Sequence, residues 1–147
     1  MKRISRSAIV ERSAGDFYAL VEAIEAYPEF LPWCVAAEVR ERTPGRTVAV
    51  LTLAVKGVRQ SFTTENSNAP GQSIEMRLIE GPFTSFAAAW RFTPLGAGAC
   101  KAEYSMEYEF SSRMLARLLA PLFDGIANSM VDAFTRRADE RYGRAAG

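Results

Sequence analysis

Few residues of this chain belong to the types that do acid–base or nucleophilic chemistry. There is no histidine among its 147 residues, which excludes Ser-His and Cys-His nucleophile pairs, imidazole metal ligands and a histidine pH switch. General acid–base work would therefore fall to Glu80, Tyr104 or Tyr108. No CxxC, P-loop or GxGxxG motif is present either. The sequence contains no evident catalytic constellation, so we expect a binding protein that has no metal, no cofactor and no enzyme activity.

The composition is that of an ordinary globular protein, and the charge argues against a nucleic-acid partner. Hydrophobic residues make up 48% of the chain, aromatic residues 11% and charged residues 24%. Eighteen basic and seventeen acidic residues leave a net charge of +1. So small a charge creates no global field that attracts nucleic acid or anionic lipid. We expect no DNA partner, and any such contact would need a local patch.

The start of the chain and its cysteines both point to the cytoplasm. The first residues, "MKRISRSAIVERS", are basic but lack the apolar core of a signal peptide. No stretch approaches the roughly 20 apolar residues of a membrane span. In this setting Cys34 and Cys100 are favoured as reduced, partly buried thiols over a disulfide. We expect a cytoplasmic protein that does not span a membrane.

Strict alternation of apolar and polar residues marks the second half of the chain. In "CKAEYSMEYEF", residues 100–110, apolar or aromatic side chains alternate with charged or polar ones. This pattern is typical of antiparallel strands that have one face in water. Gly- and Pro-containing turns divide the chain into strands, and Thr63, Thr64, Asn66 and Asn68 are interpreted as strand-end and turn residues. Strands are predicted near 4–11, 35–42, 47–55, 59–66, 73–80, 84–93 and 99–110.

Two helices are predicted to flank these strands. Ser13 can cap a first helix that extends through Ile24 and ends at Pro28. A second, much longer helix is predicted over 111–143, because apolar residues there keep i, i+3, i+4 spacing. Pro121 falls inside it, so we expect a kink or break at that point.

The order of these elements predicts a single α+β domain. A sheet of about seven strands with one apolar face must cover that face with the one large apolar object left, the C-terminal helix. We therefore predict a helix-grip fold, in which a curved antiparallel sheet wraps around the long C-terminal helix. The domain is predicted to cover 3–143, followed by a short tail at 144–147.

The segment "YPEFLPWC", residues 27–34, concentrates apolar bulk where proline forbids a regular helix or a central strand. One interpretation is a hydrophobic plug that caps the open end of the sheet. The other is a gate, in which Phe30, Leu31 and Trp33 close a tunnel mouth and enter a bilayer surface when it opens. A plug and a gate have the same composition, and only mobility or exposure separates them.

Several short motifs in this order resemble one known family. They are "YPEFLPWC" at 27–34, "GPF" at 81–83, "WRFTPL" at 90–95, "YEF" at 108–110 and "FTRRADERYG" at 134–143. The chain resembles the bacterial coenzyme-Q-binding, START-like proteins, a family that also contains proteins named ribosome-association toxins. The likeness covers residues 3 to 143. At 86–89 the chain has Phe-Ala-Ala-Ala where the family leads us to expect a leucine and a glycine.

The resemblance implies a START-like helix-grip fold with a lipid-sized cavity. It also implies binding of ubiquinone or a similar polyprenyl lipid in support of respiration, with ubiquinone as a bound ligand rather than a redox cofactor. Inward-facing aromatic and methionine side chains fit either a pocket or an ordinary solid core, and the polar tips of the tyrosines favour a pocket. The residues expected to bind the ligand are Phe30, Leu31, Trp33, Met76, Phe83, Trp90, Tyr104, Met106, Tyr108, Leu119, Leu122, Phe123, Ile126 and Met130.

Two other functions are compatible with the same resemblance. One is a ribosome-associated inhibitor of translation, which a net charge of +1 does not favour. The arginines at 136, 137, 141 and 144 could contact RNA, or they could form the solvated end of a helix. The other is an aromatase/cyclase-like enzyme. The leading hypothesis stays a lipid-binding protein, cytoplasmic and peripheral to the inner membrane, that contacts the membrane surface transiently.

Overall fold

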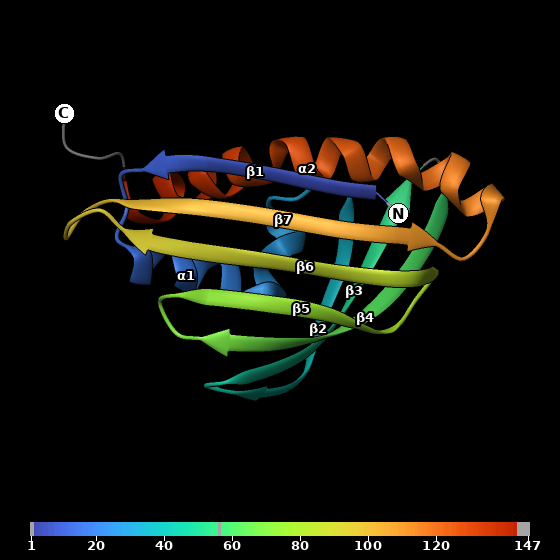
Figure 1. Cartoon of the computed structure of the whole chain (residues 1–147), viewed down its shortest axis with the longest axis horizontal. Helices are drawn as coiled ribbons and strands as arrows, with labels where there is room; N and C mark the ends of the chain where they lie inside the picture. The colour runs from blue at the N-terminus through green and yellow to red at the C-terminus, as the bar shows by residue number, and fades with distance from the viewer. Residues whose placement is uncertain (1, 56, 144–147) are drawn as a thin grey trace.

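Seven antiparallel strands form one curved sheet in the computed structural model, which describes residues 2–55 and 57–143 (Figure 1). The spatial order is β1-β7-β6-β5-β4-β3-β2, so every neighbour except β1–β7 is also a neighbour in sequence. This confirms the predicted α+β fold and the antiparallel sheet. The strands are β1 (Lys2–Val10), β2 (Cys34–Thr43), β3 (Arg46–Val55), β4 (Val58–Ala69), β5 (Ser73–Glu80), β6 (Phe83–Pro94) and β7 (Cys100–Phe110).

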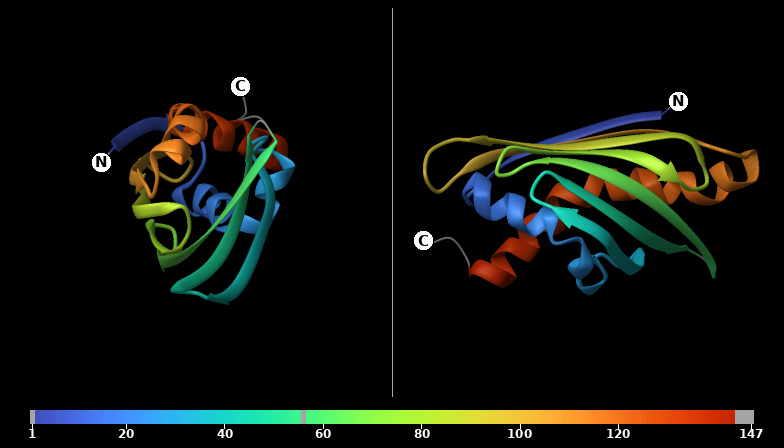
Figure 2. Two further views of the ribbon diagram at one scale, coloured as in Figure 1. Left: turned by 90° about the vertical axis from the view of Figure 1, so that its right-hand side faces the viewer. Right: turned by 90° about the horizontal axis from the view of Figure 1, so that it is seen from below.

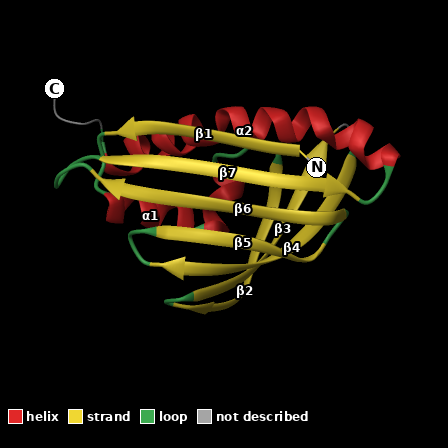
Figure 3. Ribbon diagram, in the orientation of Figure 1, coloured by secondary structure: helices red, strands yellow, loops and turns green. Residues whose placement is uncertain are grey.

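The sheet bends around the helices and leaves its other face to water. Figure 2 shows the strands curving around the helical elements, and Figure 3 shows the helices gathered on one side of the sheet. In β7 every second residue from Cys100 to Tyr108 is buried, as the alternation predicts. Irregularities of register occur in β2, β5 and β6, and such bulges increase the local bend of a strand.

The first helix is shorter than predicted. α1 (Ala14–Glu22) begins after Ser13, whose side chain accepts a hydrogen bond from the Asp16 amide. It ends at Glu22, before the predicted end at Pro28, and a 3-10 helix, η1 (Ile24–Glu29), follows. Pro28 lies inside η1, because proline's fixed φ suits a short 3-10 turn in which its missing N–H is not needed. The prediction that one helix continues to Pro28 is therefore wrong.

The long C-terminal helix is continuous. α2 (Arg113–Tyr142) is capped by Ser112, whose hydroxyl accepts from the Leu115 amide, and no break occurs at Pro121. Pro121 is exposed, and so is Arg117, whose carbonyl loses its helical partner. Water can bind this carbonyl, which explains why the helix tolerates the proline. The predicted break is wrong for this reason.

By length and composition alone, α2 could cross a membrane, with an apolar stretch of mean hydropathy 1.2. In the fold this apolar character has another explanation, since the buried residues Leu119, Phe123 and Phe134 pack in the core beneath the sheet.

An aromatic cluster joins the sheet to both helices. The Trp90 ring on β6 lies 5.4 Å from the Phe134 ring of α2 and 6.0 Å from the Phe17 ring of α1, measured between centroids. It also stacks on Phe92 with an interplanar angle of 8°. Buried aromatic pairs of this kind add about 0.5–1.5 kcal/mol each beyond the area they bury. The cluster therefore holds α1 and α2 against the concave face.

The "GPF" motif is a point of close backbone approach between β4 and β6. A Cβ atom added to Gly81 would lie 2.6 Å from the Cβ of Phe62, far inside contact distance. Only glycine allows the β5–β6 connection to pass this close to β4. Phe62 is itself packed against Phe83 and Phe86, so the glycine fixes one wall of the interior.

Candidate ligand-binding site

A partly enclosed, mainly apolar cavity of about 50 Å³ lies between the concave face of the sheet and α2. It is smaller than a typical ligand pocket, which measures roughly 300–1,000 Å³. In this conformation the interior is nearly a packed core with a small void. The cavity is lined by Tyr27, Trp33, Leu51, Leu53, Phe62, Thr64, Met76, Phe86, Trp90, Tyr104, Met106, Phe123, Ile126, Met130 and Phe134.

The lining contains no charged side chain, and its polar atoms are mostly engaged. The Tyr104 hydroxyl donates to the Met106 sulfur at 3.4 Å, and the Tyr27 hydroxyl donates to the Val21 carbonyl. Burial raises the pKa of both phenols, so both are neutral over the physiological range. The remaining polar groups of the wall are the Thr64 hydroxyl and the indole N–H groups of Trp33 and Trp90. The cavity is therefore suited to binding an apolar molecule rather than to proton transfer.

Eight of the predicted ligand-binding residues meet at this cavity. They come from the segment after η1, from β5, β6 and β7, and from one side of α2, so the fold brings together residues separated by about 100 positions in the chain. Alternate residues of a strand point to the same face of the sheet, and residues three or four apart on a helix lie on the same side. These two periodicities explain why the eight side chains point toward the same space. The eight are Trp33, Met76, Trp90, Tyr104, Met106, Phe123, Ile126 and Met130.

Four other predicted residues lie at the end of the molecule where α2 begins, or deeper in the core, and do not line the cavity. Phe83 and Tyr108 are buried, and their rings pack against Phe123. Leu119 is 1% exposed, and Leu122 is half-buried. These four residues do not line the cavity, because helical spacing shows which side of α2 is buried but not where along that side the void lies, and their part in ligand binding stays a prediction.

Phe30 and Leu31 are also outside the cavity lining. Leu31 is 1% exposed and belongs to the core, so it cannot reach a bilayer without an opening of the segment. Phe30 packs on Phe134 of α2, with ring centroids 5.1 Å apart. In this conformation the segment 27–34 plugs the interior, and Tyr27 and Trp33 are its members that line the cavity.

An arginine of α2 holds this plug in place. Arg137 forms a 2.6 Å ion pair with Glu29 at the end of η1, and its guanidinium lies 5.0 Å from the centroid of the Phe30 ring. The Arg137 side chain is 11% exposed and that of Glu29 is 62% exposed, so the ion pair is shielded from water on the Arg137 side only. We call Arg137, Glu29 and Phe30 the latch.

The arginine cluster at the end of α2 is therefore not uniform. Arg137 is used inside the fold, where it also pairs with Glu140 at 3.4 Å. Arg136 and Arg141 are exposed, as the end of a solvated helix predicts. Arg144 and the predicted tail 144–147 lie outside the described residues. At most two arginines of the described part of this cluster face solvent freely.

Sequence reasoning missed seven residues of the cavity lining, and the misses on β3 and β4 have identifiable reasons. β4 runs to Ala69, so Thr64 and Asn66 are buried on the concave face, and the prediction of strand-end and turn positions is wrong for them. The continuous apolar pattern of β3 could have identified its inward residues. The missed residues are Tyr27, Leu51, Leu53, Phe62, Thr64, Phe86 and Phe134.

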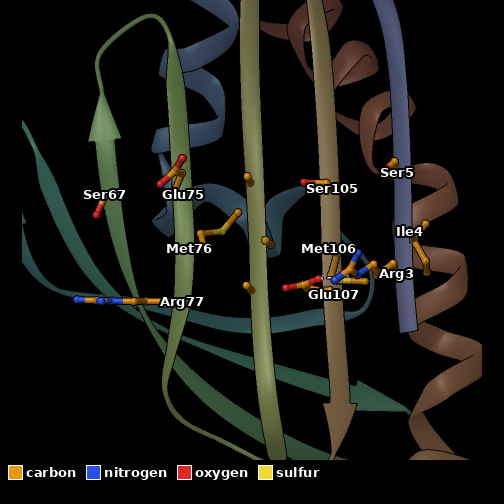
Figure 4. A pocket seen from close by; sticks show the side chains of 13 residues that line it. Arg3, Ile4, Ser5, Ser67, Glu75, Met76, Arg77, Ser105, Met106 and Glu107 are labelled. Carbon is orange, nitrogen blue, oxygen red and sulfur yellow. Dashed lines mark ion pairs between the residues drawn. The ribbon is translucent and has the colours of Figure 1, made fainter. Parts of the chain in front are cut away.

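The outer face of the sheet carries a larger but open groove of about 500 Å³ (Figure 4). Ala87 and Ala89 of the unusual 86–89 stretch line it, because outward alanines leave a depression between the charged neighbours. Arg3 and Glu107 form a 2.8 Å ion pair across one side of it. Open, charged and exposed to water, this groove lacks the enclosure of a lipid site.

The candidate acid–base and thiol residues lie at different places in the fold. Glu80 is exposed on the rim of the sheet, at the end of β5. Burial, with the Asp124 carboxylate nearby, raises the pKa of Tyr108 to about 12. Cys34 and Cys100 are buried free thiols, and burial raises the pKa of Cys34 to about 11. Among the described residues, no group of three or more His, Cys, Asp or Glu side chains is placed to hold a metal ion.

A curved antiparallel sheet that grips a long C-terminal helix over an interior cavity defines the START-like class of folds. The chain belongs to the family described as "Polyketide cyclase / dehydrase and lipid transport", which matches residues 10–135. It is 43% identical over 143 residues to a Vibrio cholerae protein named ribosome association toxin RatA, covering 97% of this chain and 99% of that protein. It is 30% identical over 149 residues to the Xenopus laevis coenzyme Q-binding protein COQ10 homolog B, mitochondrial, covering 97% of this chain and 61% of that protein.

The fold is also that of a solved aromatase/cyclase. The crystal structure of the Zhui aromatase/cyclase from Streptomyces superposes with a TM-score of 0.79, covering 99% of this chain and 98% of that one. The identity is 19%, so this likeness shows the fold alone. The two named relatives bear out the resemblance seen in the sequence, in which coenzyme-Q-binding proteins and ribosome-association toxins share one family.

Proposed function

We propose that the chain binds a polyprenyl quinone or a similar lipid between the sheet and α2, and shields it from water in support of respiration. The observation that carries this proposal is the partly enclosed cavity between the concave face and α2, whose lining has no charged side chain. The similarity to a coenzyme Q-binding protein supports the choice of ligand class. Burial of an isoprenoid tail at about 25 cal/mol per Å² can supply affinity with few polar contacts.

Ligand entry requires the interior to expand, since the present void of about 50 Å³ cannot hold a quinone ring. The latch lies where such an opening would begin, because it ties the plug to α2 through one ion pair and one cation–π contact. Release of the latch would move Trp33 away from the void and open a path to it. We propose that this occurs at a membrane surface, where the protein binds transiently from the cytoplasm.

The two tryptophans of the chain provide the test. Trp33 and Trp90 both line the cavity, so a quinone bound there lies within contact distance of both fluorophores. Titration with decylubiquinone should quench the tryptophan emission in a saturable way. N-acetyltryptophanamide titrated in parallel corrects for absorption and collisional quenching by the quinone. Quenching no greater than that of this reference compound would refute the proposal.

A second candidate function is association with the ribosome. It is supported by the 43% identity, over nearly the full length of both chains, to the relative named ribosome association toxin. Exposed arginines such as Arg136 and Arg141 are available for RNA contact, although the net charge of +1 gives weak electrostatic attraction. Co-sedimentation of the purified protein with ribosomal subunits, at low and at moderate salt, tests this candidate. This candidate function is independent of lipid binding, because ribosome contact would use the outer surface of the protein.

We infer that the bound molecule is held rather than converted. The lining offers a threonine hydroxyl and two phenols of raised pKa, and no carboxylate, thiol or amine. General acid–base catalysis near neutral pH needs groups with pKa values close to the working pH. Incubation of the quinone with the protein, followed by chromatography of the extracted ligand, should return it unchanged.

A further inference from the structure

Three buried polar residues, Thr47, Thr64 and Asn66, and the half-buried Asn68 lie together on β3 and β4, and Thr64 among them lines the cavity. They form two hydrogen-bonded pairs, in which Thr64 Oγ1 donates to Asn66 Oδ1 at 2.9 Å and Asn68 Nδ2 donates to Thr47 Oγ1 at 2.9 Å. The register places Thr47 directly opposite Asn66 on the neighbouring strand. Thr47 is 1%, Asn66 2% and Thr64 5% exposed. We call these four residues the polar cluster.

The polar cluster is connected to the void. Thr64 lines the cavity, and Asn66 is paired in register with Met76, another lining residue. The sheet is irregular here, because Thr63 pairs with Glu80 while Thr64 pairs with Leu78, which leaves one extra residue on β5. Bulges of this kind re-aim side chains next to binding sites.

The cluster has hydrogen-bonding capacity that the described residues do not use. Asn68 Oδ1 is buried and has no hydrogen-bond partner among them. The amide nitrogen of Asn66 donates none of the hydrogen bonds found within the described part of the chain, and it is not one of the fully buried atoms left without a partner there. Buried polar groups in folded proteins are nearly always paired, and an unpaired one costs free energy. The unused donor and acceptor are therefore available to a bound molecule.

The charge of that molecule is restricted by the same surroundings. No lining residue of the cavity is charged, and the polar cluster consists only of hydroxyl and amide groups. The charged residues Arg42 and Glu25, and likewise Arg137 and Glu29, pair with each other, and none of the four lines the cavity. A carboxylate or phosphate brought into the cavity would be buried without a counter-charge, which is strongly unfavourable.

Building on the proposed function, we propose that the cavity selects a neutral ligand, whose oxygen-bearing head binds the polar cluster through Asn66 and Thr64 while its apolar tail lies against α2. A quinone carbonyl or a methoxy oxygen can accept from the Asn66 amide. A quinol hydroxyl can in addition donate to Asn68 Oδ1. Fatty acids and phospholipid headgroups are excluded by their charge.

The test compares matched probes and matched variants in one fluorescence assay. Decylubiquinone is titrated directly, and decylbenzene, which has the same tail without oxygen atoms, is titrated as its competitor. Methyl palmitate and palmitate are compared in the same way, because they differ essentially in the charge of the head. The variants are Asn66→Leu and Thr64→Val, with Thr52→Val as the control, since the Thr52 hydroxyl bonds Ser61 on the outer face.

We expect each inner variant to weaken decylubiquinone binding about three- to tenfold, the loss typical of one neutral hydrogen bond. Decylbenzene should bind the variants as it binds the wild type, and Thr52→Val should change neither affinity. Methyl palmitate should compete at least about tenfold better than palmitate, a difference of about 1.4 kcal/mol. Melting curves establish that each variant is folded, and Thr64→Val, the smaller change, decides the matter if Asn66→Leu does not fold.

The outcomes separate the two proposals. If the wild type binds none of the probes, the proposed function itself fails. If it binds decylubiquinone and a folded Thr64→Val or Asn66→Leu protein binds it equally well, head recognition by the polar cluster is wrong while lipid binding stands. Equal competition by palmitate and methyl palmitate would overturn the selection against charge.

Discussion

Replacement of Ile126 by phenylalanine should stabilise the protein and abolish ligand binding at the same time. Ile126 lies on α2 and lines the void of about 50 Å³. Buried voids cost about 24 cal/mol per Å³, so this one costs about 1.2 kcal/mol at most. A larger side chain that fills it recovers part of this free energy, and we expect a gain of about 0.5–1 kcal/mol. For a chain of this size such a gain raises the melting temperature by roughly 1–4 °C.

The control for Ile126→Phe is Leu119→Phe on the same helix. Leu119 is 1% exposed and does not border the void, so the larger ring should overpack the core and cost about 1–3 kcal/mol. Urea unfolding curves, followed by tryptophan fluorescence, measure both changes. Decylubiquinone titration should show at least about a tenfold weaker affinity for Ile126→Phe, because the site can no longer expand around the ring. A destabilised Ile126→Phe protein that binds the quinone as tightly as the wild type would refute this reasoning.

Three further predictions concern the latch, a buried tyrosine and the thiols. Arg137→Met should lower the free energy of unfolding by about 1 kcal/mol, since it removes a partly exposed ion pair and a cation–π contact. It should also speed quinone exchange in stopped-flow quenching. The control Arg141→Met should change neither the stability nor the exchange rate. The pKa of Tyr108 is raised to about 12 from an ordinary value near 10, so its contribution to stability is fully present below pH 10 and is lost progressively as pH rises toward 12. In urea titrations over that pH range, a Tyr108→Phe protein should lose less stability than the wild type. Iodoacetamide at pH 8 should leave Cys34 and Cys100 unmodified in the folded protein and should alkylate both in denaturant, and rapid labelling of the native thiols would show that the interior is open.

The sheet and the long helix could be predicted from the sequence because their periodicities are clean. In β7 the alternation from Cys100 to Phe110 defines both the strand and its buried face. Helical spacing identified α2, but Pro121 was misjudged, since sequence alone did not show that it lies on the exposed side of the helix. Local patterns thus predict elements well, and they predict the consequences of a proline only when its side of the element is known.

The candidate site was predicted in part, and the failures have one physical cause. Trp33, Trp90 and Tyr104 were expected at the cavity because bulky inward groups are rare outside a core. Thr64 and Asn66 were assigned to a strand end, because a polar residue on an alternating strand normally faces water. The two-residue repeat of a strand shows which residues share a face of the sheet. Only the completed fold shows that Thr64 and Asn66 are on the face that points inward.

The most direct test of the central claim, that the interior holds a neutral lipid, is mass spectrometry of what the protein carries. The wild type and Ile126→Phe are purified side by side without detergent from the same cells, extracted with organic solvent, and compared with a mock preparation. We predict a neutral quinone or a related polyprenyl lipid in the wild-type extract, strongly reduced in the Ile126→Phe extract. No lipid above the mock preparation, or the same phospholipids in equal amounts from both proteins, would contradict the claim.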